Sequence, residues 1–148
     1  MNRFMQLAIE EAHKGVMQND GGPFGAVIVK DDVVIAQAHN SVLHTKDPTA
    51  HAEMLAIQHA SKKLDSFDLS GCDIYTTCMP CPMCMGALQW ANVRTIYYGA
   101  TSLDAEKAGF RDKQFHEEEQ NQPLIELGRE ASLEVFKLWN AKEDKIIY

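Results

Sequence analysis

The chain has 148 residues, of which 45% are hydrophobic and 24% are charged, a composition that fits one globular domain and excludes a disordered chain. Its 14 basic and 21 acidic side chains give a formal net charge of −7, which argues against a nucleic-acid partner because phosphates favour a basic surface. No apolar run reaches the roughly 18 residues of a membrane helix, and Glu10 and Glu11 interrupt the N-terminal segment, so we expect a cytoplasmic protein with no membrane partner.

The predicted elements alternate between helices and strands. Residues 2–18 carry apolar side chains at helical spacing, and "DGGPFG" ends that helix. The β-branched runs "AVIVK" and "VVIAQA" flank Asp31 and Asp32, which predicts a hairpin. Asp47 and Pro48 predict a helix start, because Asp is a good N-cap and Pro suits the first turn; this helix should reach about Leu64. Further along we expect a strand at "CDIYTT", a helix ending near Asn92, a strand at "RTIYYGA", a fifth strand at "PLIEL" and a helix over residues 132–143.

This order of elements implies helices packed on both faces of a mixed sheet. The predicted fold is therefore α/β, a three-layer α/β/α arrangement around a mixed five-stranded sheet. We expect residues 1–148 to form a single domain, since the sequence contains no linker or repeat.

Three cysteines lie three residues apart in the segment "TCMPCPMCMG", so two C-x-x-C pairs are available. In a reducing compartment such cysteines are more typical of thiol or metal chemistry than of disulfides. Pro82 suits the first position of a helix, which leaves Cys81 at the N-cap and Cys84 one turn later on the same face. We therefore favour Cys81 and Cys84 as metal ligands, whereas Cys72 and Cys78 are better explained as small buried residues.

The segment "TAHAEM" at the start of another helix supplies the third candidate ligand, His51. Side chains in the first turn of a helix lean toward its N-terminus, so two strand-to-helix junctions at one sheet edge can face each other across an ion. His51, Cys81 and Cys84 leave the fourth position of a tetrahedral zinc open, which is typical of a catalytic site. Glu53 lies two residues from His51 and is placed to exchange protons with a water that the zinc activates.

The combination of H-A-E with P-C-x-x-C resembles the zinc nucleobase deaminases of the cytidine and deoxycytidylate deaminase superfamily. The segments "GGPFGAVIVKD", "DPTAHAE", "PCPMC" and "AGF", together with a C-terminal tyrosine, are most similar to the bacterial guanine deaminases within it. That resemblance implies a cytidine deaminase-like fold, one Zn²⁺ per subunit and hydrolytic deamination of guanine to xanthine and ammonia. It also implies a homodimer in which the C-terminal segment, about residues 129–148, crosses to the neighbouring subunit.

The resemblance further implies which residues act in the site. Zinc would be held by His51, Cys81 and Cys84, with Glu53 as the proton carrier. The residues implied to contact the base are Phe24, Asn40, the backbone N–H of Ala52, Asp112 and Tyr148. One departure is Met79, which stands before P-C where the family usually has an acidic residue.

Several of these residues also fit simpler interpretations. Phe24 fits a core position, Asn40 fits a cap on a turn, and Asp112 fits an exposed acidic segment. The tail "KIIY" fits packing on the domain as well as a lid over the site.

Other functions also fit the zinc motif. A tRNA adenosine deaminase shares it but needs a cationic surface, and a cytosine or triazine deaminase differs in the free base that is accepted. In a different class, the zinc would be structural in an interaction module, and its removal would then unfold the domain.

Overall fold

The structure, a computed structural model, describes residues 1–118 and 122–148. The chain divides into two compact units, Met1–Glu118 and Glu119–Tyr148. The elements of the first unit are α1 (Arg3–Met17), β1 (Gly25–Lys30), β2 (Val33–His39), α2 (Val42–Thr45), α3 (Ala52–Leu64), β3 (Cys72–Cys78), α4 (Pro82–Trp90), β4 (Thr95–Ala100), α5 (Ser102–Lys107) and α6 (Asp112–Glu117). The second unit contains α7 (Arg129–Ala141).

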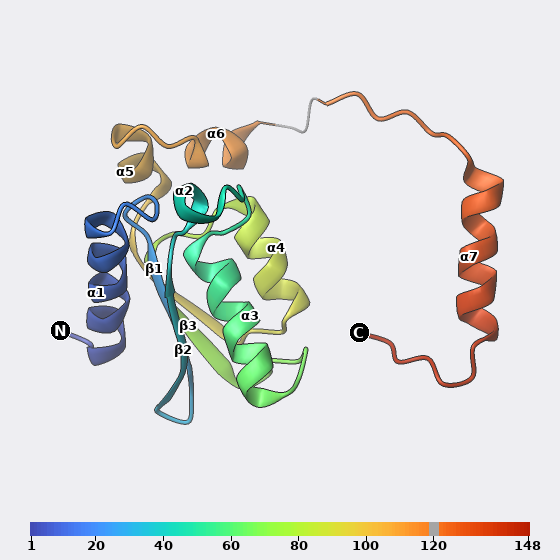
Figure 1. Ribbon diagram of the computed structural model, residues 1–148, viewed down its shortest axis with the longest axis horizontal. Coiled ribbons are helices and arrows are strands. Elements are labelled where there is room, and N and C mark those ends of the chain that lie inside the picture. Colours follow the sequence, from blue (N-terminus) through green and yellow to red (C-terminus); the bar gives the residue numbers. More distant parts are fainter. Residues whose placement is uncertain (119–121) are drawn as a thin grey trace. The chain divides into compact units, whose positions relative to one another are not determined.

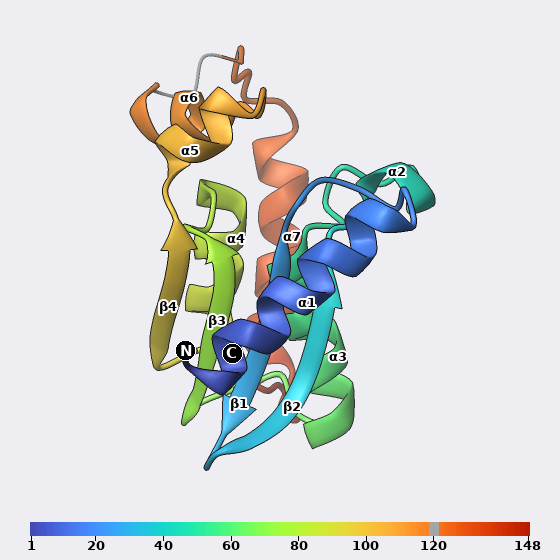
Figure 2. The same ribbon diagram turned by 90° about the vertical axis from the view of Figure 1, so that its left-hand side faces the viewer.

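The sheet is mixed, as predicted, with the strand order β2-β1-β3-β4 (Figure 2). Strand β1 runs antiparallel to both β2 and β3, and β3 runs parallel to β4. Ile28 at the centre of β1 pairs with Ala36 on one side and with Ile74 on the other. The parallel pair β3 and β4 is connected through α4, so the sheet delivers the cysteine segment to the end of a central strand.

Helices cover both faces of this sheet, which confirms the three-layer arrangement for the first unit (Figure 1). On one face α1 packs Phe4 and Ala8 against Val27 and Val29 of β1. On the other face lie α3 and α4, and the core there is rich in alanine. Its buried members include Ala26, Ile28, Ala52, Ala56, Ala60, Ile74 and Leu88. The alternation of buried side chains along β1 between the two faces follows from the two-residue period of a strand.

The prediction of a fifth strand at residues 123–127 is wrong. The sheet has four strands among the described residues, and the segment "PLIEL" has no strand conformation. A segment this short becomes a strand only when its backbone pairs with a sheet edge, and Leu124, Ile125 and Leu127 are highly exposed instead. Its apolar residues therefore gave a strand signal without the tertiary partner that a strand needs.

Two helix boundaries differ from the prediction. The third helix begins at Ala52 rather than at Pro48, because the Asp47 side chain accepts hydrogen bonds from both the N–H and the hydroxyl of Thr49. Such a local side-chain contact stabilises a turn in competition with helix. The last helix spans Arg129–Ala141, about three residues earlier than expected.

The other predicted elements are confirmed, including the first helix, the hairpin, the strands at "CDIYTT" and "RTIYYGA", and the helix that follows the cysteines. The short helices α2, α5 and α6 were not predicted, since four to six residues carry little periodicity. No helix in residues 1–118 or 122–148 combines the length and apolarity that crossing a bilayer demands.

Candidate metal centre and active site

Two helix starts meet at one end of the sheet. Cys78 is the last residue of β3, Cys81 is the N-cap of α4 and Pro82 opens that helix. His51 is the N-cap of α3, and its carbonyl accepts the first hydrogen bond of that helix from Leu55. The predicted placement of the histidine and the cysteine pair at helix starts is confirmed.

The three expected ligand atoms converge. Nδ1 of His51 lies 3.6 Å from Sγ of Cys81 and 3.5 Å from Sγ of Cys84. All three atoms lie within 4.8 Å of one another. In the described part of the chain this is the one cluster of three such residues suited to a metal, and Cys72 and Cys78 lie outside it. One imidazole and two sulfur ligands at this separation suit a tetrahedral ion with one further position for a non-protein ligand.

The electrostatics of the three groups are those of a metal-binding set. Hydrogen bonds from Cys84 and from His51 lower the pKa of Cys81 to about 4, so this sulfur is a thiolate. The hydrogen bond to Cys81 raises the pKa of Cys84, and burial acts in the same direction. The hydrogen bond with Cys81 also raises the pKa of His51. The pKa shifts of Cys84 and His51 both depend on their hydrogen bonds to Cys81, and a divalent cation bound by the three groups would replace the protons of those bonds.

Glu53 lies beside this cluster on the first turn of α3 and is only 5% exposed. Burial raises the pKa of its carboxyl group. Oε2 accepts a long hydrogen bond of 3.5 Å from the Cys84 thiol, and Oε1 accepts one of 2.9 Å from the Thr76 hydroxyl. A buried carboxyl group that adjoins the metal ligands and favours its protonated form has the properties of a proton carrier.

Thr76 was not identified from the sequence. It lies in the middle of β3 and is completely buried, so strand alternation alone assigns it to the core. The one signal in the sequence was a polar residue at an inward position two residues before Cys78, which a buried hydrogen-bonding partner would require.

Asn40 directly follows β2 and is 6% exposed. Its backbone N–H donates to the carbonyl of Phe24, and its side-chain Oδ1 accepts from the N–H of Val42. The amide oxygen is therefore occupied, and the NH₂ group is the part of this side chain that can donate to a ligand. A Cβ at Gly21 would lie 2.1 Å from this Oδ1, so only glycine allows the preceding loop to approach Asn40 so closely.

Phe24 packs against Phe110, the aromatic residue of the "AGF" segment, to which no role was assigned from the sequence. The rings of Phe24 and Phe110 meet edge to face with their centroids 4.9 Å apart. Asp112, two residues after Phe110, is the first residue of α6. Burial raises the pKa of Asp112, the negative Cys81 adds to this effect, and His51 opposes it. These charge effects place Asp112 within electrostatic range of Cys81 and His51, and its contact with the base stays a prediction.

The last two residues expected to contact the base, Ala52 and Tyr148, belong to different units of the chain. Ala52 is completely buried at the first position of α3, where a backbone N–H has no partner within its own helix. Tyr148 belongs to the second unit of the chain, so its contact with the base stays a prediction.

Comparison with known proteins places this geometry in a family. The family described as the cytidine and deoxycytidylate deaminase zinc-binding region matches residues 1–100, which include both helix starts. The chain belongs to this family. Zinc is accordingly the metal that the cluster of His51, Cys81 and Cys84 fits.

Two relatives extend the comparison across the chain. Guanine deaminase from Bacillus subtilis (strain 168) is 41% identical over 151 aligned positions, which cover 98% of this chain and 97% of the relative. Its crystal structure superposes with a TM-score of 0.93 and covers 100% of this chain and 99% of that one. Guanine deaminase from Nitrosomonas europaea is 32% identical, with a TM-score of 0.69 over 89% of this chain and 70% of that chain.

A third relative matches a shorter part of the chain. The tRNA-specific adenosine deaminase from Aquifex aeolicus (strain VF5) is 43% identical over 106 residues, which cover 72% of this chain and 68% of the relative. The fold of the first unit and its zinc-binding region are thus cytidine deaminase-like.

Proposed function

We propose that this protein deaminates guanine by hydrolysis to xanthine and ammonia. The observation that carries this proposal is the extent of its similarity to a guanine deaminase, which includes the C-terminal third of the chain as well as the zinc-binding region. The tRNA-specific relative from Aquifex aeolicus covers only 72% of the chain, although its identity in the matched part is similar. The net charge of −7 also argues against tRNA as the substrate.

The metal ligands in this proposal are His51, Cys81 and Cys84, with one zinc per subunit. When bound, zinc acts as a Lewis acid that activates water for attack on C2 of guanine. Three protein ligands leave room for this chemistry, whereas a fourth would close the site.

Glu53 moves the protons. As a carboxylate it takes a proton at Oε2 from the attacking water, and it then delivers that proton to the ring nitrogen N3. The second proton comes from the hydroxyl group that the water leaves on C2 and passes through the same carboxyl group to the amino group, which departs as ammonia while C2 becomes a carbonyl. The burial that raises the pKa of Glu53 supports this role, because a carrier must hold the proton between the two deliveries.

Four residues of the first unit recognise the base in this proposal. The NH₂ group of Asn40 and the backbone N–H of Ala52 donate hydrogen bonds to acceptors on the purine, and the carboxyl group of Asp112 pairs with its N–H edge. Phe24, held by Phe110, packs against the ring. Adenine presents a different pattern of donors and acceptors, and each mismatched buried group costs about 1–3 kcal/mol, so these contacts favour guanine.

We further propose that the protein is a homodimer in which residues 129–148 dock on the neighbouring subunit, with Tyr148 closing its site. Helix α7 carries large apolar side chains, Leu133, Phe136, Leu138 and Trp139 among them. A unit that has one helix among its described residues, 122–148, is too small to enclose a core of its own, so these side chains require another surface. Exchange of a terminal element between identical chains supplies one at low energetic cost.

We place the protein in the cytoplasm. All four cysteines are free and buried, and a reducing compartment preserves the thiols that bind zinc.

Ammonia release from zinc-loaded protein tests the proposed reaction. We expect release from guanine and little or none from adenine, cytosine or the corresponding nucleosides. Preferential release from adenosine in tRNA, with steep salt dependence of tRNA binding, would overturn the substrate assignment in favour of the tRNA class.

A further inference from the structure

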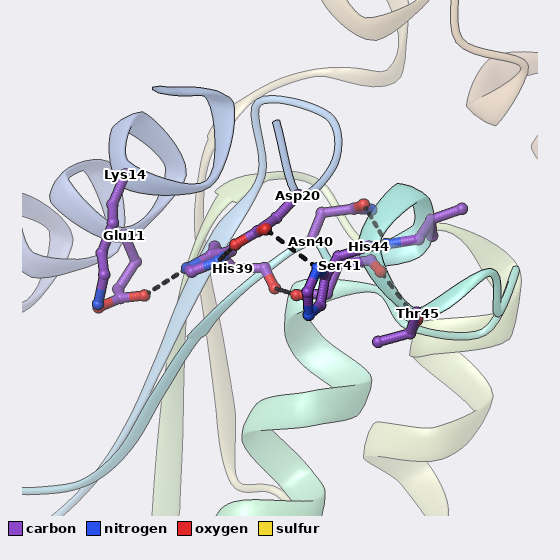
Figure 3. A network of polar contacts seen from close by, with 9 residues as sticks. Glu11, Lys14, Asp20, His39, Asn40, Ser41, His44 and Thr45 are labelled. Carbon is purple, nitrogen blue, oxygen red and sulfur yellow. Dashed lines mark hydrogen bonds and ion pairs between the residues drawn. The ribbon is translucent and has the colours of Figure 1, made fainter. Parts of the chain in front are cut away.

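A histidine next to Asn40 is held between two carboxylates. His39 is the last residue of β2, and its Nδ1 lies 2.8 Å from Oε2 of Glu11 while its Nε2 lies 2.8 Å from Oδ2 of Asp20 (Figure 3). Glu11 comes from α1 and Asp20 from the loop that follows α1, so the ring joins three segments of the chain. None of these three residues belongs to the metal centre or contacts the base in the proposal above.

The geometry constrains the protons on the ring. An ionised carboxylate can only accept a hydrogen bond, so both contacts are satisfied when both ring nitrogens carry a proton. The side chains of His39, Glu11 and Asp20 are only 14%, 10% and 16% exposed, so water screens these pairs weakly. Charge-assisted hydrogen bonds in such surroundings fix the plane of the ring from two sides.

Three further groups border this arrangement. Lys14 lies 3.8 Å from the other oxygen of Glu11, and the side-chain amide of Gln37 donates to that same oxygen. His44 of α2 lies 3.7 Å from Oδ1 of Asp20. One oxygen of each carboxylate thus has another partner. The remaining oxygen, Oε2 of Glu11 or Oδ2 of Asp20, pairs with His39.

Helix α1 contains a glycine where the imidazole lies. A Cβ at Gly15 would come within 2.6 Å of Cδ2 of His39, so the ring packs directly on the helix backbone. Glycine inside a helix costs about 1 kcal/mol relative to alanine, and this contact explains why the position is not alanine. The His39 ring is therefore positioned by close packing against α1 as well as by its two carboxylate partners.

The same contacts lead to Asn40. The backbone carbonyl of Asp20 accepts hydrogen bonds from the N–H groups of Leu43 and His44, which fixes the start of α2. Gly21, the next residue, packs against the Asn40 side chain, whose orientation is set by the N–H of Val42. The His39 to Asp20 contact, drawn next to Asn40 in Figure 3, thus holds the loop whose next residue, Gly21, packs against the Asn40 amide.

We propose that His39 is a positioning residue for Asn40. Because Glu11 and Asp20 hydrogen-bond its two ring nitrogens, His39 fixes the direction in which the Asn40 NH₂ group points, although His39 does not itself contact the substrate. This role rests on the proposed function, because it assumes that Asn40 binds the base. Its structural part, the orientation of the Asn40 amide, is independent of the reaction.

The main test is a double-mutant cycle between His39→Gln and Asn40→Ala, measured as kcat and KM for guanine. Glutamine cannot satisfy both carboxylates in the geometry of the imidazole, so we expect His39→Gln to raise KM about tenfold with a smaller effect on kcat. In the Asn40→Ala background the same change should alter kcat/KM by less than about twofold, because the group through which it acts is gone. If the losses in kcat/KM of the two single variants simply multiply in the double variant, the proposal is overturned.

Gly15→Ala gives a second perturbation that keeps every charge in place. The new methyl group displaces the ring while it improves the helix propensity of α1, so we expect the same rise in KM and the same dependence on Asn40. His13→Gln changes an exposed histidine on the same helix and is the matched control, for which wild-type kinetics are expected. Wild-type KM in a correctly folded Gly15→Ala variant would contradict the proposal.

Nuclear magnetic resonance separates this proposal from the proposed function. In the folded protein, His39→Gln or Gly15→Ala should move the side-chain NH₂ resonances of Asn40, whereas His13→Gln should leave them in place. Moved Asn40 resonances in a protein that does not turn over guanine would retain the positioning role and reject guanine as the substrate. Guanine turnover with unmoved Asn40 resonances would reject the positioning role and retain the substrate.

Discussion

The hydroxyl of Thr76 and the carboxyl group of Glu53 form a buried pair, 2.9 Å apart, that can stay hydrogen-bonded in both protonation states of the carboxyl group. When Glu53 is ionised, the hydroxyl donates to it. When Glu53 is protonated, its O–H can donate to the Thr76 oxygen, because the hydroxyl proton can then turn to the carbonyl of Cys78 at 3.2 Å. A proton carrier benefits from a partner of this kind, since neither state leaves a buried polar group unsatisfied.

Replacement of Thr76 by valine should therefore shift the pH dependence of the reaction. The Thr76 hydrogen bond opposes the effect of burial and lowers the pKa of Glu53, so its loss raises that pKa further. The acid limb of kcat/KM should move to higher pH by about one unit or more, since a hydrogen bond to a charged group contributes roughly 1.5–3 kcal/mol. Steady-state kinetics between about pH 4 and 9, a range that includes the ordinary pKa values of Glu (about 4.3) and His (about 6.5), measure this shift.

Thr76→Ser retains the hydroxyl and is the matched control. We expect its acid limb to stay close to that of the wild type, even if packing around the lost methyl group reduces stability. An unshifted profile in Thr76→Val would remove Thr76 from the proton pathway.

Zinc affinity should increase with pH. Metal binding needs a neutral His51 and a deprotonated Cys84, and the hydrogen bonds of the metal-free cluster raise both pKa values, so protons compete with zinc at neutral pH. Each proton released on binding strengthens the affinity by about tenfold per pH unit. Competition with a chromophoric chelator at pH 6, 7 and 8 measures the slope, and an affinity independent of pH would contradict the assigned ligand set.

Asp112→Asn should weaken guanine turnover without loss of zinc. The substitution removes the charge but keeps the shape, so kcat/KM should fall about 10- to 100-fold, equivalent to roughly 1–3 kcal/mol for one buried contact. Zinc content measured by atomic absorption should stay at one per chain. Glu117→Gln on the same helix alters an exposed ion pair with Lys113 and should leave both quantities unchanged.

The proposed exchange of C-terminal segments predicts complementation between two inactive chains. One chain carries Glu53→Gln with an intact tail, and the other keeps Glu53 but lacks Ile146, Ile147 and Tyr148. If the tail acts on the neighbouring subunit, co-expression should restore about a quarter of wild-type activity, because half of the dimers are mixed and each has one complete site.

Ammonia release from the co-purified pair, compared with each chain alone, measures this restoration. No gain over the separate chains would mean that the tail acts on its own subunit or not at all. Full activity of the truncated chain alone would remove Tyr148 from the site.

The sequence predicted those features that local rules determine. The positions of Cys81 and Pro82 at a helix start follow from capping preferences. The roles of His51 as a metal ligand and Glu53 as a proton carrier follow from their two-residue spacing, which places the carboxyl group beside the metal without making it a ligand. Their convergence, with the ligand atoms within 4.8 Å, needed only the assumption that both helix starts lie at one sheet edge.

Features set by tertiary contacts were missed or wrong. Nothing local marks Thr76 as the partner of a residue 23 positions earlier, or Glu11 as the partner of one 28 positions later. The strand predicted at "PLIEL" is wrong for the converse reason. The composition of this segment favours a strand, but it does not pair with an edge of the sheet. Asp47 was assigned as a cap, yet its side chain closes a turn with Thr49.

The central claim is that a buried carboxyl group beside a three-ligand zinc site carries the protons of a guanine deaminase, and Glu53→Gln tests it most directly. The amide keeps the size of the side chain but cannot exchange the proton. Zinc content should therefore remain one per chain, whereas kcat for ammonia release from guanine should fall by about 10²- to 10⁴-fold. A variant that binds zinc normally and still turns over guanine at the wild-type rate would contradict the account.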